Sequence, residues 1–257
     1  MTGRVFLIGA GPGDPELMTL RAVRLLSKAD VVVFDRLVSK EILDMAPKTA
    51  RMITVGKAPK CHTVPQERIN EILVEEALAG HTVARLKGGD PLIFGRGSEE
   101  AAFLAEHGIE TEYVPGITAA QGAASVSGVP LTHRGLATGV QYVTGHRQAD
   151  KVLDLDWKRL ADPNTTLVVY MGVANIGQIA MGLMTEGLSA NTPVMAISRA
   201  TTEEEDRLVT SLGCVAQDAR DAGLQAPTLF IIGKVVSLYG EQTQPELSQS
   251  IRGVAHA

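Results

Sequence analysis

The stretch VFLIGAGPGDPE, residues 5–16, decides the fold of the first half of the chain. It begins with Val5–Ile8, a short apolar run that is typical of a buried strand. The glycine-rich turn Gly9–Gly13 follows directly. Asp14–Pro15–Glu16 then has the composition of a helix start, because it offers an N-cap acid, a proline at the first helical position and a carboxylate in the first turn. The stretch therefore predicts a strand, a tight loop and a helix whose apolar face holds Leu17, Leu20, Val23 and Leu26.

The same order of strand, loop and helix continues as far as residue 114. We expect a helix at about Ser98–His107 and further strands at Val31–Phe34, Met52–Val55, Thr82–Leu86 and Glu112–Val114. Strands that alternate with helices predict a mainly parallel sheet with helices on its faces. The first half of the chain is therefore expected to be an α/β domain.

The pattern changes after Pro130. Helices are expected at about 173–186 and 215–222, and strands at 140–144, 166–171, 193–197, 207–211 and 228–232. The third and fourth of these strands are close enough in sequence to form a hairpin, so the second half should contain a mixed sheet.

A domain boundary is expected at Pro115–Gly116, where the alternating pattern ends. The sequence thus predicts two α/β domains, an N-terminal one over residues 1–115 and a C-terminal one over 116–240. The remaining residues, 241–257, are polar and lack periodicity, so they are expected to form a flexible tail.

The composition excludes several classes of protein. Among the 257 residues, 24 Lys and Arg stand against 29 Asp and Glu, which gives a net charge of −5, and aromatic residues make up only 4%. A chain with few aromatics and no overall positive field is poorly suited to bind nucleic acid or anionic lipid. No nucleic-acid partner is therefore expected, and any anionic ligand must be held by a local cluster of cations.

The apolar runs and the cysteines indicate a reduced cytoplasmic protein. The longest apolar runs are far too short to span a bilayer, and the N-terminus enters a strand pattern without a leader segment, so no membrane is expected. The two cysteines, Cys61 and Cys214, have no spacing typical of a metal site. We therefore expect a cytoplasmic location and no bound metal.

Four loops directly follow the first four predicted strands. They are Gly9–Asp14, Asp35–Arg36, Gly56–Lys57 and Gly88–Pro91. In open α/β sheets, ligands bind at the carboxyl ends of the strands. These loops should therefore meet at one edge of the sheet and form the binding site.

The glycine loops leave three interpretations open. The first loop resembles a dinucleotide-binding turn, with Asp35 in the place of the ribose-binding acid, but Asp14 replaces its third glycine and would repel a pyrophosphate. The loop Gly88–Gly89 lets backbone atoms approach a ligand closely, and Asp90 adds an acceptor. A ligand with a ribose, an adenine and an amino-acid end, such as S-adenosylmethionine, fits that loop. Tight structural turns explain both loops without a ligand.

Nine short strings then reveal a resemblance to the tetrapyrrole methylase family, which covers about residues 3–240. The glycine loops are shared by the whole family, whereas the strings at 35–38, 94–97, 130–134 and 144–146 resemble most closely its members that methylate uroporphyrinogen III on carbon. The strings are GPGDPE (11–16), FDRLV (34–38), VGK (55–57), RLKGGDP (85–91), FGRG (94–97), VPGITA (114–119), PLTHR (130–134), TGH (144–146) and YMG (170–172).

The resemblance implies an architecture and an activity. It implies two α/β domains with an active-site cleft between them, a homodimer, and S-adenosylmethionine bound as the methyl donor, which leaves as S-adenosylhomocysteine. The implied reaction is the transfer of two methyl groups to uroporphyrinogen III, which gives precorrin-2. By position, the implied cofactor contacts are Pro12, Gly88, Gly89, Asp90, Ile93, Thr118, Ala119, Met171, Ala200, Thr228 and Leu229.

The implied substrate is a flexible macrocycle that bears eight carboxylates, and the resemblance assigns residues to it. Asp35 and Lys57 match the positions of the proton acceptor and the proton donor, and Arg96 is the third catalytic candidate. An arginine fork suits a carboxylate because it donates two parallel hydrogen bonds. The residues expected to contact the substrate are Arg36, Arg96, Glu99, His133, Arg134 and Met171.

Three alternatives remain at this stage. A later precorrin C-methyltransferase of the same family would share the glycine loops. An NAD(P)-dependent oxidoreductase would use the first loop and Asp35. A tetrapyrrole carrier without chemistry would need the cations but not two glycine loops.

Overall fold

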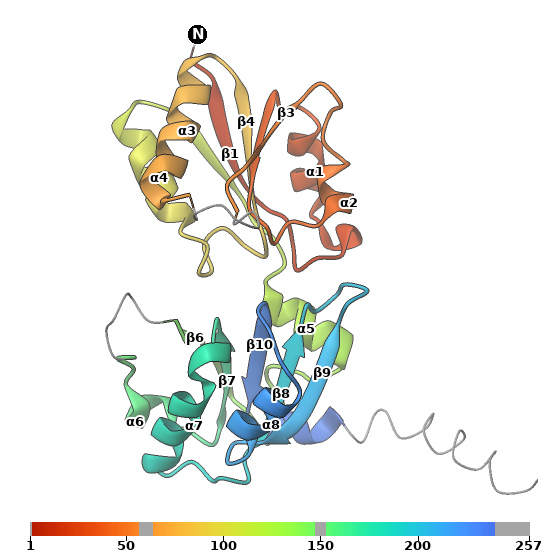
Figure 1. Ribbon diagram of the computed structural model, residues 1–257, viewed down its shortest axis with the longest axis vertical. Helices are drawn as coiled ribbons and strands as arrows, with labels where there is room; N and C mark the ends of the chain where they lie inside the picture. The colour runs from red at the N-terminus through yellow and green to blue at the C-terminus, as the bar shows by residue number, and fades with distance from the viewer. Residues whose placement is uncertain (1, 57–63, 147–152, 240–257) are drawn as a thin grey trace, which may run out of the picture. The chain divides into compact units, whose positions relative to one another are not determined.

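The computed structural model describes residues 2–56, 64–146 and 153–239 (Figure 1). The chain divides into two compact units, residues 1–122 and 123–257, and the division falls within helix α5, Ala119–Ser127. The boundary expected at Pro115–Gly116 lies just before this helix and stays a prediction. The tail over 241–257 lies outside the described residues.

The first unit is a five-stranded sheet with the order β3-β2-β4-β1-β5, and every neighbouring pair is parallel. The prediction of a parallel sheet is therefore confirmed. The strands are β1 (Arg4–Gly9), β2 (Val31–Phe34), β3 (Arg51–Thr54), β4 (Thr82–Lys87) and β5 (Thr111–Val114). The helices are the 3-10 turn η1 (Pro15–Leu17), α1 (Leu20–Leu26), α2 (Lys40–Leu43), α3 (Gln66–Leu78) and α4 (Gly97–Glu106).

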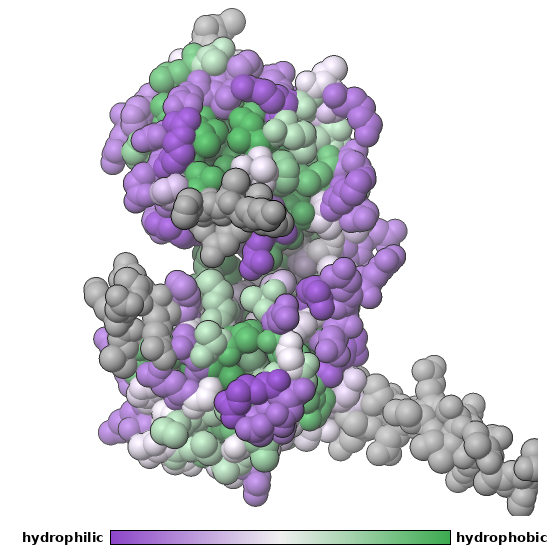
Figure 2. All heavy atoms as spheres, viewed as in Figure 1, coloured by the Kyte–Doolittle hydropathy of each residue, from purple (hydrophilic) through white to green (hydrophobic). Residues whose placement is uncertain are grey.

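Helices cover both faces of this sheet. Leu26 of α1 and Ile42 of α2 pack with Ala84 and Leu86 of β4 on one face, whereas α3 and α4 pack on the other face against alternate residues of the same strand, such as Val83. Figure 1 shows the two pairs of helices on opposite sides of the sheet, and Figure 2 shows hydrophilic residues over the outer sides of α3 and α4. The alternation along β4 thus places neighbouring side chains in two separate cores.

The first helix begins later than the sequence predicted. Asp14 accepts a hydrogen bond from the backbone N–H of Glu16, but the turn that it caps, η1, ends after three residues. A second cap follows at Thr19, whose hydroxyl accepts from the N–H of Ala22 and starts α1. Because of this restart the helical phase differs from the one predicted, and Leu20 is 91% exposed instead of lying on the apolar face.

The second unit is a mixed sheet with the order β6-β7-β10-β8-β9. β6 and β7 are parallel, and the pairs β7–β10, β10–β8 and β8–β9 are antiparallel, which confirms the predicted hairpin. The strands are β6 (Gly139–Thr144), β7 (Thr165–Tyr170), β8 (Pro193–Ser198), β9 (Asp206–Ser211) and β10 (Thr228–Ile232). The helices are α6 (Trp157–Leu160), η2 (Val173–Asn175), α7 (Ile176–Thr185), α8 (Val215–Asp221) and η3 (Lys234–Ser237).

The direction of its strands brings several predicted site residues of the second unit to one edge of its sheet. β6, β7 and β8 run the same way, and β10 runs against them, so the carboxyl ends of the first three and the amino end of β10 lie at one edge. The predicted residues Met171, Ala200, Thr228 and Leu229 all belong to segments at this edge. Among the described residues, no helix is long and apolar enough to cross a membrane.

Candidate functional site

The two glycine loops of the first unit are joined by their backbones. The N–H of Gly11 donates to the carbonyl of Gly89 at 3.2 Å, and the N–H of Gly89 donates to the carbonyl of Gly11 at 2.7 Å. Both residues have positive φ, 76° and 70°, a conformation that favours glycine. The loops after β1 and β4 therefore form one structure, as the sequence predicted for loops at the carboxyl ends of parallel strands.

A third backbone segment, which contains Gly116, packs against the two glycine loops. A Cβ atom on Gly116 would lie 2.2 Å from the carbonyl oxygen of Gly89, and one on Gly9 would lie 2.5 Å from the nitrogen of Gly116. Asp90 ties this segment down, because its Oδ1 accepts from the N–H of Leu92 at 2.8 Å and its Oδ2 accepts from the N–H of Gly116 at 3.0 Å. Asp90 therefore holds the loop in shape, and each of its oxygens keeps a lone pair for a ligand.

The candidate cofactor residues separate into two groups. Seven of them lie in the loops at the carboxyl edge of the first sheet or, for Ala119, at the start of α5: Pro12, Gly88, Gly89, Asp90, Ile93, Thr118 and Ala119. The other four lie at the corresponding edge of the second sheet: Met171, Ala200, Thr228 and Leu229. Their roles in binding stay predictions.

Asp35 stands directly after β2 at the same edge of the first sheet. Its Oδ1 accepts from the N–H of Leu37 at 2.9 Å, and its Oδ2 lies 3.9 Å from Nη1 of Arg85. The side chain is 27% exposed, so the carboxylate is partly open to solvent and partly in contact with the interior. Lys57, the predicted proton donor, lies outside the described residues.

Arg96 and Glu99, both predicted to contact the substrate, pair with each other. Nε of Arg96 donates to both carboxylate oxygens of Glu99, at 3.0 and 3.1 Å, and Nη2 donates to Oε2 at 2.6 Å. The hydrogen bond from Arg96 lowers the pKa of Glu99. Both side chains are about half exposed, and Arg96 has a φ of 56°, which is rare for a residue with a side chain. The guanidinium of Arg96 is therefore engaged by Glu99 in this structure.

The interior beneath Asp35 holds a buried charge cluster, which we define as Arg85, Lys87 and Glu100. Glu100 is fully buried, and the other two side chains are 3% and 5% exposed. Oε1 of Glu100 accepts from Nε and Nη2 of Arg85 at 3.2 Å each, from Nζ of Lys87 at 2.7 Å and from Nε2 of Gln66 at 3.2 Å. Oε2 of Glu100 has no hydrogen-bond partner among the described residues.

Sequence reasoning missed Arg85 and Glu100 as members of this site. Two signals were present in the sequence. Arg85 stands in a predicted strand between Ala84 and Leu86, and a strand of a parallel sheet is buried on both faces, so its charge has no route to solvent. Glu100 is four positions before Leu104 and so shares the buried face of α4 with it. The partnership of the two residues is a tertiary contact that neither signal reveals.

Burial lowers the pKa of the Lys87 ammonium below its ordinary value of 10.5, and the positive charge of Arg85 lowers it further. Glu100 opposes both effects through its charge and its hydrogen bond. The charged ammonium is therefore held in the interior at a cost that Glu100 reduces.

At the edge of the second sheet, the strand ends are packed as tightly as in the first unit. The N–H of Gly145 donates to the carbonyl of Tyr170 at 2.7 Å, and a Cβ atom on Gly145 would lie 2.6 Å from the Cα of Gly172. Met171, between these two contacts, has a φ of 55° and is 49% exposed. Its side chain is therefore available to a ligand at this edge.

The loop after β8 is fixed to the start of β10. The hydroxyls of Ser198 and Thr228 lie 2.7 Å apart, and the N–H of Arg199 donates to the carbonyl of Pro227 at 3.0 Å. Thr228 is buried and its hydroxyl also donates to the carbonyl of Gln225. Thr228 thus has a structural role here, and its contact with a cofactor stays a prediction.

The other predicted substrate residues are exposed cations or histidines. Arg36 follows Asp35 at the edge of the first sheet. His133 and Arg134 lie in a turn of the second unit, in which the N–H of His133 donates to the carbonyl of Ala137 at 3.0 Å.

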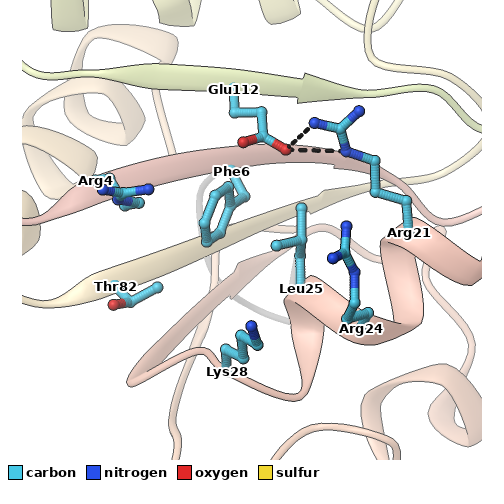
Figure 3. A pocket seen from close by; sticks show the side chains of 8 residues that line it. All are labelled: Arg4, Phe6, Arg21, Arg24, Leu25, Lys28, Thr82 and Glu112. Carbon is cyan, nitrogen blue, oxygen red and sulfur yellow. Dashed lines mark hydrogen bonds and ion pairs between the residues drawn. The ribbon is translucent and has the colours of Figure 1, made fainter.

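A surface pocket of about 350 Å³ in the first unit lies away from these loops. Arg4 and Thr82, at the amino ends of β1 and β4, line it together with residues of α1. Figure 3 shows Leu25 between the ring of Phe6 and Arg24, and Arg21 donating two hydrogen bonds to Oε1 of Glu112. Because it opens at the amino ends of the strands, this pocket is not part of the candidate site. Among the described residues, no group of His, Cys, Asp and Glu is arranged to hold a metal ion.

Known proteins with similar sequences cover both units. The family model for tetrapyrrole (corrin/porphyrin) methylases matches residues 4–216. The uroporphyrinogen-III C-methyltransferase of Paracoccus denitrificans is 57% identical over 244 residues, which cover 95% of this chain and 85% of that protein. The siroheme synthase of Pseudoalteromonas atlantica is 51% identical over 236 residues, which cover 92% of this chain but 51% of that protein. The chain thus spans about half the length of that relative.

A solved structure has the same fold. The uroporphyrin-III C-methyl transferase from Thermus thermophilus, crystallised with S-adenyl homocysteine, has a TM-score of 0.78 and 43% sequence identity. The match covers 91% of this chain and 93% of that chain. The likeness therefore extends over most of both units.

The contact between Gly116 and Gly89 leads to a first prediction. Gly116→Ala places a Cβ atom 2.2 Å from a backbone carbonyl, so the loops must separate. We expect the free energy of unfolding to fall by about 1–3 kcal/mol. Chemical denaturation measures the change. The control is Gly139→Ala in β6, where the nearest atom to the new Cβ is 3.9 Å away, and equal stability of the two variants would contradict the prediction.

The buried ammonium of Lys87 leads to a second prediction. The pKa of this ammonium is lower in the folded chain than in the unfolded chain. Just below pH 10.5 the unfolded chain therefore binds more protons, so the contribution of Lys87 to the free energy of unfolding rises with pH in that window. The slope for one group is at most about 1.4 kcal/mol per pH unit. Lys87→Met should remove this contribution, whereas Lys28→Met, at an exposed site, should keep it. Urea denaturation at a series of alkaline pH values measures the free energy of unfolding of each variant. If the free energy of Lys87→Met rises with pH as steeply as that of the wild type, Lys87 is not the group responsible.

Proposed function

The chain belongs to the tetrapyrrole (corrin/porphyrin) methylases, and on this premise we propose that it transfers two methyl groups from S-adenosylmethionine to carbon atoms of uroporphyrinogen III, which gives precorrin-2. The observation that carries the proposal is the union of the two glycine loops at the edge that also presents Asp35. The named relatives support it, since one is a uroporphyrinogen-III C-methyltransferase and another is a structure with the demethylated cofactor.

The first unit fits the cofactor on structural grounds. At Gly9, Gly89 and Gly116 the backbones pack so closely that a Cβ atom on Gly9 or Gly116 has no room, which fixes the loops that we expect to contact the cofactor. Asp90 offers a carboxylate whose position is fixed by two backbone hydrogen bonds. S-adenosylmethionine supplies a methyl group on a positively charged sulfur when it is bound.

The geometry also argues against a dinucleotide at the first loop. The pyrophosphate of a dinucleotide needs the N-terminus of a helix that starts directly after the loop. Here the loop is followed by η1, a single turn of three residues that is already capped by the carboxylate of Asp14. The oxidoreductase alternative therefore has neither the third glycine nor the helix that it requires.

The chain's own residues have three tasks in the reaction. In the first unit Arg36 and Arg96 hold substrate carboxylates, and in the second unit Arg134 and its neighbour His133 do the same. The loops align the macrocycle and exclude water, which accounts for much of the rate when the methyl donor is already activated. Methylation of a pyrrole carbon leaves a positive charge that is relieved by loss of a proton, and Asp35 accepts that proton, with Lys57 as the donor that returns one. Met171 lies along the cofactor or the macrocycle.

We further infer a cytoplasmic homodimer. The resemblance to the family supports the dimer, and the absence of a membrane-crossing helix among the described residues is compatible with a cytoplasmic location. Light scattering at micromolar concentration should give twice the mass of the 257-residue chain. A monomeric mass would overturn the dimer.

Anaerobic incubation with S-adenosylmethionine and uroporphyrinogen III tests the activity. Mass spectrometry should detect the addition of two methyl groups to the macrocycle, and calorimetry should detect binding of S-adenosylhomocysteine but not of NAD(P). Tight NAD(P) binding without methyl transfer would overturn the proposed function. Methylation of a precorrin but not of uroporphyrinogen III would favour the later precorrin enzymes instead.

The role of Arg96 gives a further prediction. Loss of one charge-assisted pair to a substrate carboxylate costs at least about 2 kcal/mol when the site is desolvated. Arg96→Leu should therefore lower kcat/KM by at least about thirtyfold, and the affinity for S-adenosylhomocysteine should stay unchanged. Arg24→Leu, an exposed arginine of α1, serves as the control. If Arg96→Leu loses cofactor affinity and melting temperature together with activity, Arg96 stabilises the loop and does not bind substrate.

A further inference from the structure

The buried charge cluster lies at the centre of the first sheet, directly beneath its functional edge. β4 is the middle strand, and Arg85 and Lys87 are two positions apart on it, so both side chains lie on the face covered by α3 and α4. Glu100 reaches them from α4. The carbonyl of Lys87 accepts from the N–H of Ala10, so the strand end that carries the cluster also carries the first glycine loop.

The charges of the cluster do not balance without Asp35. Arg85 and Lys87 are two buried cations, and Glu100 is one buried carboxylate. Among the described residues, the ion pairs of the cluster include one further carboxylate, that of Asp35, at 3.9 Å from Arg85. The four charges sum to zero only when Asp35 is counted, so the interior cluster and the carboxylate at the edge form one electrostatic unit.

The guanidinium of Arg85 connects the two carboxylates. Its Nε and Nη2 donate to Glu100, whereas Nη1 donates to the carbonyl of Leu86 at 2.9 Å and faces Asp35. A guanidinium is planar and rigid, so fixing one side of it fixes the direction of the other. Glu100 therefore determines which way Arg85 presents Nη1 to Asp35.

Stability alone is a poor explanation for these buried charges. A buried ion pair is often no more stabilising than apolar residues of the same volume. All four donors to Glu100 converge on Oε1, and Oε2 is buried without a partner among the described residues, which is itself unfavourable. An arrangement of this kind, in contact with a residue of the reactive edge, suggests a role in the reaction.

We propose that Glu100 is a positioning residue, which through Arg85 fixes the place of the Asp35 carboxylate at the edge of the first sheet. The inference rests on the proposed function, in which Asp35 accepts a proton. Glu100 is fully buried and does not touch the substrate. Its part is to hold Arg85, so that Asp35 faces a cation at Oδ2, while Oδ1, which accepts from the N–H of Leu37, keeps a lone pair for the reaction.

Glu100→Gln tests the proposal, because it keeps the shape of the side chain and removes its charge. We expect kcat for methyl transfer to fall about tenfold to a hundredfold, as for a displaced catalytic group, with the affinity for S-adenosylhomocysteine unchanged. Glu106→Gln, at an exposed position of the same helix, is the matched control and should leave kcat unchanged. Wild-type kcat in Glu100→Gln would overturn the proposal.

A double-mutant cycle with Asp35→Asn separates positioning from a general loss of structure. If Glu100 acts through Asp35, the double variant should be no slower than Asp35→Asn alone, within about twofold, because the effects of residues in one network are not additive. Two losses that multiply would show that Glu100 acts elsewhere and would overturn the proposal.

A second variant keeps the test decisive if Glu100→Gln does not fold. Arg85→Lys preserves the number of buried charges but lacks the rigid fork, so it should reproduce the fall in kcat and the same lack of additivity with Asp35→Asn. A wild-type rate in a folded Arg85→Lys would overturn the proposal. A wild-type protein that transfers no methyl group at all would overturn the proposed function, and the inference with it.

Discussion

The close approach of three backbone segments is the constraint on which the edge of the first sheet depends. Gly9, Gly89 and Gly116 leave no room for Cβ atoms on the first and the last of them, and Gly11 and Gly89 exchange two backbone hydrogen bonds. Segments that are far apart in the sequence can meet in this way only where side chains are absent. The position of Asp90 follows from that meeting, since its carboxylate binds the N–H of Gly116.

The strands and the edge that carries the loops could be predicted from the sequence, because both depend on local patterns. Val31–Phe34 is a continuous apolar run and Thr228–Ile232 is apolar after its first residue, and the structure has strands with those bounds. Asp35 follows the first of these runs, so its place at the edge needed no knowledge of contacts. The predicted start of the first helix was wrong for a local reason. Asp14 and Thr19 are both good N-caps, and the sequence alone does not show that Asp14 caps only a single turn.

The buried charge cluster could not be predicted in the same way. Arg85 and Glu100 are charged residues at positions where the pattern of their strand or helix predicts burial. Only the packing of α4 on β4 shows that they form an ion pair. Lys87 directly precedes the glycine loop Gly88–Pro91 in the sequence. Its side chain is 5% exposed and points inward, so its charge acts on the interior and not directly on a ligand.

Residues with a strained backbone lie at the same sheet edges as the glycine-rich loops. Among the described residues, five residues other than glycine have φ values between 47° and 68°: Phe94, Arg96, Met171, Arg199 and Thr201. All five follow β4, β7 or β8, at the carboxyl ends that carry the predicted site residues. Residues with side chains keep this conformation only where the surrounding structure enforces it, and such positions cluster at functional sites. Because the sequence shows glycines but not strain, the strained residues are independent support for placing the function at these two edges.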